Sequence, residues 1–164
     1  MKFDTKFITR AAIIGAIYTA LTLAVLLTPL GALAFGPIQF RVSEALTVLP
    51  ALTPAAVPGL FVGCLVSNLV GTAAGVAGGI LDIVFGSLAS LIAAYLSYRL
   101  RRHTWLVPLP PVIINAVVVG LVLHFALDFP LLMTMLTVGA GQAIACYLLG
   151  LPLLLMLKRT NIFK

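Results

Sequence analysis

The chain has 164 residues, of which 62% are hydrophobic and only 9% are charged, whereas soluble domains carry about 25% charged residues. Its mean hydropathy of +1.22 leaves too little polar surface to cover a water-soluble globule. This composition excludes a cytosolic enzyme, a nucleic-acid-binding protein and a disordered tail. It predicts one membrane-embedded domain over residues 1–164, and the net charge of +6 then needs an explanation in terms of membrane topology.

The first apolar run long enough to cross a bilayer covers residues 11–29 and follows several basic residues. A signal peptide is the alternative, because Ala32-Leu33-Ala34 resembles a cleavage site after a charged start. We favour a membrane span, since the run is longer than the ~7 to 15 apolar residues of a signal core.

A loop and a short helix are expected next. Gly36 and Pro37 interrupt residues 31–40, which predicts a loop, and a helix follows over residues 42–53. At 1.5 Å per residue this helix is only about 18 Å long, too short to cross the membrane alone. Part of the preceding loop is therefore expected to enter the protein, where its backbone is shielded from lipid.

Four more helices complete the predicted fold. They are expected over residues 54–71, 80–98, 108–127 and 131–157. The Gly-rich segment GTAAGVAGG joins the first two of these, and a turn at residues 128–130 joins the last two. The sequence thus predicts an all-α integral membrane protein with six transmembrane helices, the second of them short.

Basic residues indicate how this bundle is oriented. With six spans, both termini and the link between spans four and five lie on one side. That side holds nine of the ten basic residues: Lys2, Lys6, Arg10, Arg99, Arg101, Arg102, Lys158, Arg159 and Lys164. The positive-inside rule makes it the cytoplasmic side of a cell membrane. The outer side holds Arg41, Glu44, Asp82 and Asp128, one positive and three negative charges, which sum to −2.

Polar side chains from several predicted helices fall close to the outer side. An ionisable group at the centre of a membrane helix costs about 2.5–3.5 kcal/mol, so each should have a partner, a cavity or an interface. The helical members of this set are Glu44, Asn68, Asp82, His124 and Gln142, and Gln39, Phe40 and Arg41 lie in the loop above them. The pattern predicts a substrate-binding pocket that opens outward.

Alternatives remain for several of these residues. Glu44 and Asp82 are also compatible with positions at the headgroups, near helix N-termini. For Asp82 this is disfavoured, because Gly86 and other small residues follow it at intervals of four and indicate a face turned towards the bundle. Arg41 is suited equally to pairing with a carboxylate and to binding a ligand. Asn115 lies nearer the midplane and is expected to bond across helices.

Small residues also form two stripes. Ala12, Ala16, Ala20 and Ala24 recur along the first span, and Gly59, Gly63, Ser67 and Gly71 along the third. Such stripes allow helices to approach closely. Internal packing is favoured for the third span. For the first, spacing alone leaves internal packing and a partner surface open.

The sequence lacks the motifs of the main catalytic alternatives. It has no GxxxxGK[ST] loop, so the chain is not expected to hydrolyse ATP by itself. It has no cluster of metal ligands, and no cofactor or metal is expected. The isolated His124 and the loop position of Asp128 disfavour intramembrane proteolysis, so no catalytic residues are assigned. A membrane scaffold and a small enzyme using Asp82 remain the alternatives to a binding protein.

Three segments carry a resemblance to a known family. They are FGPIQFRVSEALTVLPALTPAAVPGLFVGCLVSNLVG, GGILDIVFGSLASLIAAYLSYRLR and PLPPVIINAVVVG. Together they closely resemble the QueT family of queuosine-precursor transporters, which belongs to the substrate-binding S components of energy-coupling factor (ECF) transporters. The similarity covers nearly the whole chain.

The resemblance implies a six-helix protein that captures its ligand from outside, beneath the loop between helices one and two. It implies a 7-deazaguanine ligand such as preQ0, preQ1 or queuine. It also implies a transmembrane coupling protein and two ATPase subunits as partners, with Ala12, Ala16 and Ala20 at the contact. A carboxylate of Glu44 or Asp82 would suit the N–H donors of the guanine-like edge, and Arg41, Gln39 or Asn68 would suit its carbonyl.

Overall fold

The computed structural model describes residues 4–29, 31, 35 and 41–160. Within these ranges it contains five helical rods that are long and apolar enough to cross a membrane: Thr5–Leu26, Ala56–Ala73, Gly79–Arg99, Thr104–Leu127 and Leu131–Arg159. A shorter apolar helix, η2, covers Val42–Ala51. The expected bundle of membrane-length helices, with a short second one, is confirmed.

Three of the rods change helix type along their length. Apart from η2, the described elements are α1 Thr5–Leu26, α2 Ala56–Ala73, α3 Gly79–Leu81, η3 Asp82–Gly86, α4 Ser87–Arg99, η4 Thr104–Leu106, α5 Leu109–Leu127, α6 Leu131–Ala143, η5 Ile144–Gly150 and α7 Leu151–Arg159. η3 and η5 are π-helical segments inside otherwise α-helical rods. Sequence reasoning did not foresee them. Such segments are rare and are often found at functional sites.

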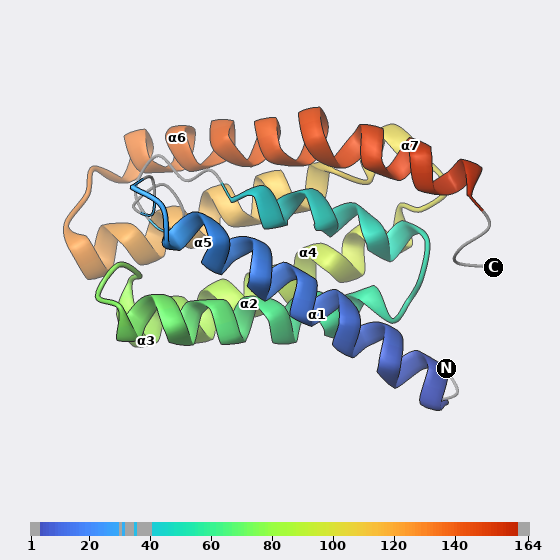
Figure 1. Cartoon of the computed structure of the whole chain (residues 1–164). Coiled ribbons are helices and arrows are strands. Elements are labelled where there is room, and N and C mark those ends of the chain that lie inside the picture. Colours follow the sequence, from blue (N-terminus) through green and yellow to red (C-terminus); the bar gives the residue numbers. More distant parts are fainter. Residues whose placement is uncertain (1–3, 30, 32–34, 36–40, 161–164) are drawn as a thin grey trace.

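The helices run back and forth between two ends of the bundle (Figure 1). The end at which α1 begins and at which α4 and α7 finish is here called the basic end. Its described basic residues are Lys6, Arg10, Arg99, Arg101, Arg102, Lys158 and Arg159. The α2–α3 link and the α5–α6 turn lie at the opposite end (Figure 1). This arrangement matches the grouping of chain ends that the sequence predicted.

Local signals explain where α5 begins and ends. Pro110 and Pro111 occupy its first turn, where the backbone N–H groups have no partner within the helix and proline is tolerated. Asp128 closes the helix with a left-handed backbone, φ 55°, and its N–H donates to the carbonyl of His124 at 3.0 Å. A short polar side chain is among the few that adopt this conformation readily. The polypeptide then reverses into α6.

The short helix η2 differs from the expectation in type and in length. It is a 3₁₀ helix that ends at Ala51, not an α-helix that reaches Thr53. Two features favour the tighter form: the Thr47 hydroxyl donates to the carbonyl of Glu44 at 2.6 Å, and Pro50 has no N–H to give to an α-helical bond. Ten residues at about 2 Å each extend about 20 Å, well short of a ~30 Å hydrocarbon layer. η2 is packed inside the bundle against η5, α4 and α1.

α1 and α2 pack with their backbones almost in contact. A Cβ atom added at Gly59 would lie 2.6 Å from the carbonyl oxygen of Ala11, and one at Gly63 would lie 2.8 Å from that of Gly15. The hydroxyl of Thr19 also donates to the Gly63 carbonyl at 3.1 Å. The glycine stripe of α2 is buried along its whole length, which confirms the prediction that it serves internal packing.

Candidate functional site

Glu44 lies at the centre of the bundle, on η2, and is only 1% exposed. The phenol of Tyr18, from α1, donates to its Oε1 atom, and the Asn115 amide, from α5, donates to Oε2 at 3.4 Å. Both carboxylate oxygens therefore have donors from other helices. The headgroup position considered for Glu44 is wrong, and the prediction that Asn115 bonds across helices is confirmed.

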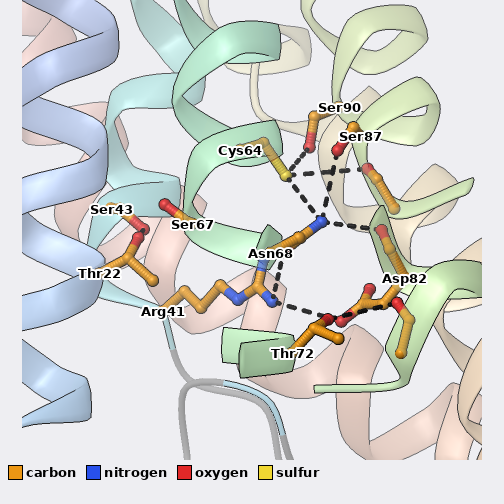
Figure 2. A network of polar contacts seen from close by, with 12 residues as sticks. Thr22, Arg41, Ser43, Cys64, Ser67, Asn68, Thr72, Asp82, Ser87 and Ser90 are labelled. Atoms are coloured by element: carbon orange, nitrogen blue, oxygen red, sulfur yellow. Dashed lines mark hydrogen bonds and ion pairs between the residues drawn. The ribbon is translucent and has the colours of Figure 1, made fainter. Parts of the chain in front are cut away.

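Arg41, Asn68 and Asp82 form a second buried group (Figure 2). Arg41 Nη2 donates to Asn68 Oδ1 at 3.2 Å and lies 4.0 Å from Asp82 Oδ2. The three side chains come from the start of η2, from α2 and from η3. Asp82 is 2% exposed, so its headgroup position is also wrong and the inward face inferred from its four-residue spacing is confirmed.

The π-helical segment η3 shapes the Asp82 side of this group. Asn68 Nδ2 donates to the backbone carbonyl of Asp82 at 2.8 Å, and Cys64 Sγ lies 3.8 Å from the carbonyl of Gly86 (Figure 2). A Cβ atom at Gly86 would lie 2.6 Å from Asp82 Oδ1 and 3.0 Å from Asn68 Nδ2. The lack of a side chain at position 86 is what lets the carboxylate and the amide share this space.

A buried aromatic ring covers Arg41. The Arg41 guanidinium carbon lies 4.3 Å from the centre of the Phe35 ring, a cation–π contact, and Phe35 is fully buried. Gly71 makes room for the ring, because a Cβ there would lie 2.6 Å from Phe35 Cζ. Sequence reasoning did not select Phe35 as a site residue, since an aromatic residue in a membrane protein is more often simple packing.

Gln142 borders the Glu44 side of the cluster. It is 2% exposed, and Cys146 Sγ lies 3.6 Å from its Oε1 atom and 3.6 Å from the backbone carbonyl of Glu44. The Thr47 hydroxyl lies 3.5 Å from the same sulfur. The polar cluster, defined here as Tyr18, Arg41, Glu44, Asn68, Asp82, Asn115 and Gln142, thus draws side chains from all six membrane-length or short apolar helices described.

Other predicted residues lie elsewhere. Gln39 and Phe40 fall outside the described residues. His124 Nδ1 bonds the backbone carbonyl of Phe129 at 2.7 Å, so its ring fastens the α5–α6 turn. Sequence reasoning missed Tyr18, because a phenol inside an apolar run carries no pattern that separates it from a core aromatic residue.

Two buried oxygens in the polar cluster lack a hydrogen-bond partner among the described residues. They are Asp82 Oδ1 and Asn115 Oδ1. Unpaired acceptors are unusual in a protein interior, because each forfeits its bonds to water without replacement. Both atoms would accept an N–H or an ammonium group from a bound molecule. These two oxygens are therefore the positions in the cluster at which a donor from outside the described residues would be accommodated chemically.

The alanine stripe of α1 faces outward. Ala12, Ala16 and Ala20 are exposed, while the contact with α2 is made by the neighbouring Gly15. The three alanines line a shallow groove whose other wall is the Gly59 and Gly63 side of α2. Internal packing, one of the two readings left open for this stripe, does not apply within the described chain.

Comparison with known proteins agrees with these features. A model of the QueT transporter family matches residues 8–159, nearly the whole chain. Searches of curated proteins and of solved structures gave no significant match. The match includes every residue of the polar cluster and all or most of each membrane-length helix, and these helices make this a multi-pass membrane protein. The chain belongs to the QueT transporter family.

Proposed function

We propose that the chain is the substrate-binding S component of an ECF-type importer and that it captures a queuosine precursor from outside the cell. The observation that carries this proposal is the polar cluster: two carboxylates, an arginine and three amides, all buried within helices whose surface is otherwise apolar. Burying such groups costs free energy, and a bundle with a purely structural role would be more stable with apolar side chains at these positions. Membership of the QueT transporter family supports queuosine precursors as the class of ligand.

The cluster is chemically matched to a 7-deazaguanine. The guanine-like edge of preQ0, preQ1 or queuine presents N–H donors beside a carbonyl acceptor. A carboxylate, Glu44 or Asp82, would receive the donors, and Arg41, Gln39 or Asn68 would donate to the carbonyl. Gln142 borders the same space, and we assign Gln39 and Phe40 of the adjoining loop to the site as well. Phe35 covers one face of the Arg41 guanidinium.

The proposed orientation places the polar cluster near the outside. Asp82 directly follows α3, which lies at the end of the bundle opposite the basic end (Figure 1), whereas the described lysines and most described arginines lie at the basic end. We place the protein in the cytoplasmic membrane. The positive-inside rule then puts the basic end and both termini on the cytoplasmic side. Ligand would enter from the opposite end, beneath the loop that precedes η2.

Import against a gradient requires energy. Because the chain has no P-loop of its own, partner subunits would supply this energy by hydrolysing ATP. We assign the exposed stripe of Ala12, Ala16 and Ala20 to contact with a transmembrane coupling protein, which two ATPases would drive. Small side chains let another helix approach closely, and van der Waals packing then supplies the attraction within the membrane. No part of the described stripe is used by the chain's own core.

Mass spectrometry of small molecules that co-purify with the protein tests the ligand proposal. We expect a 7-deazaguanine in preparations of the wild-type protein and much less in Glu44→Gln prepared in parallel. A different class of heterocycle or vitamin would contradict the ligand assignment while leaving an S component in place. Capture of protein partners with no small molecule bound, even after addition of preQ0, preQ1 or queuine, would instead indicate a scaffold.

Ala16→Leu tests the partner surface. A leucine there would obstruct the groove, so we expect ATP-dependent uptake with the coupling proteins to be abolished while ligand affinity is unchanged. Ala140→Leu is the matched control, because Ala140 is exposed on α6, away from the groove. Loss of ligand binding together with uptake in Ala16→Leu would contradict the assignment of this stripe to a partner.

A further inference from the structure

The buried charges of the polar cluster do not cancel. Counted at their formal charges, Arg41 contributes one positive charge and Glu44 and Asp82 one negative charge each, so the sum is −1; all three are at most 5% exposed. Residues 30–40 include no lysine, arginine or histidine, so the segment that precedes Arg41 in the sequence adds no positive charge. An uncompensated charge in a membrane interior is costly.

The two carboxylates are not equally satisfied. Glu44 receives a donor on each oxygen, from Tyr18 and from Asn115. Asp82 Oδ2 lies 4.0 Å from Arg41, a distance too long for a hydrogen bond, and Asp82 Oδ1 has no partner among the described residues. The carboxylate oxygen that lacks a donor is therefore Asp82 Oδ1, on the side of the cluster formed by η3.

The surroundings of Asp82 Oδ1 favour a donor that comes from outside the chain. The Arg41 guanidinium is paired with the other carboxylate oxygen, Asp82 Oδ2, and is stacked on the Phe35 ring. The Asn68 amide donates to the backbone carbonyl of Asp82 and not to its carboxylate. Because position 86 is a glycine, no side chain from that position crowds Oδ1. A cationic N–H donor placed there would supply both the missing charge and the missing hydrogen bond.

We propose that Asp82 binds a protonated amine on the ligand, so that the site selects cationic 7-aminomethyl deazaguanines over neutral ones. This rests on the proposed function and narrows its substrate class. Glu44 and the unpaired Asn115 Oδ1 are left to receive the N–H donors of the ring edge. The amine thus distinguishes the ligands, and the ring is common to all of them.

Calorimetric titration of the purified protein with preQ1 and preQ0 tests this. The two compounds share their ring, but preQ1 carries a protonated aminomethyl group where preQ0 carries a neutral nitrile. A hydrogen bond to a charged group predicts about 10- to 150-fold tighter binding of preQ1. Asp82→Asn should remove most of that preference by weakening preQ1 and leaving preQ0 nearly unchanged, and Asp128→Asn, an exposed carboxylate in a turn, should preserve it.

The outcomes separate this inference from the proposed function. Equal affinity for the two compounds in the wild-type protein would overturn the inference alone. An equal loss of both compounds in Asp82→Asn would also overturn it, because Asp82 would then bind the ring or maintain the fold. Failure of the wild-type protein to bind either compound would overturn the proposed function as well. The wild-type comparison decides the matter even if the variant does not fold.

Discussion

Gly86→Ala is expected to impair ligand binding without unfolding the protein. In most helices alanine is favoured over glycine by about 1 kcal/mol. Here the new methyl carbon would lie 2.6 Å from Asp82 Oδ1 and 3.0 Å from Asn68 Nδ2, so both groups must move. Both atoms are at the ends of side chains, so they can turn away while the backbone keeps its course. Stability should therefore change by no more than about 1 kcal/mol, because the gain in helix propensity offsets part of the strain.

Ligand affinity should fall much further than stability. Displacing Asp82 or Asn68 removes at least one hydrogen bond that involves a charged group, worth about 1.5–3 kcal/mol, or about 10- to 150-fold in Kd. Titration of preQ1 into Gly86→Ala, with thermal unfolding of the same preparation, measures both quantities. Gly139→Ala is the control, because its Cβ would lie 3.2 Å from Ala116 Cβ and within 4 Å of no side chain of the polar cluster. Wild-type affinity in Gly86→Ala would refute the reasoning.

Two further substitutions test the packing around the site. Tyr18→Phe leaves Glu44 Oε1 without its donor and should lower stability by about 1–3 kcal/mol, measured by unfolding in detergent; Tyr95→Phe, on an exposed tyrosine, should have almost no effect. Gly59→Ala brings a methyl group within 2.6 Å of a backbone carbonyl of α1, which cannot turn away, so the unfolding temperature should fall clearly, whereas Gly139→Ala should leave it nearly unchanged. Equal stability of each variant and its control would contradict the packing described here.

Much of the fold could be predicted because the bilayer imposes it. Apolar runs must be about 20 residues long to cross the hydrocarbon, and basic residues mark one side, so the number and order of helices follow from the sequence. The inward direction of Asp82 could also be predicted, from the small residues that follow it at intervals of four. These signals depend on composition and spacing, which do not require knowledge of the tertiary contacts.

The rest depends on packing between helices. The helices are apolar all round, so the sequence does not show that Tyr18 points to Glu44 while Ala16 points outward. The π-helical segments have no sequence signature beyond the glycine at the end of each, Gly86 and Gly150. Phe35 stacks on Arg41 although the two residues are six positions apart and no helical or strand periodicity connects them. Such pairings arise only when the bundle is assembled.

The most direct test of the account compares the affinity of the wild-type protein for a 7-deazaguanine with that of Glu44→Gln and Asp82→Asn. The account predicts that preQ1 binds the wild-type protein and Asp128→Asn equally well and binds both cluster variants about tenfold or more weakly. Wild-type affinity in both Glu44→Gln and Asp82→Asn would show that the ligand binds elsewhere.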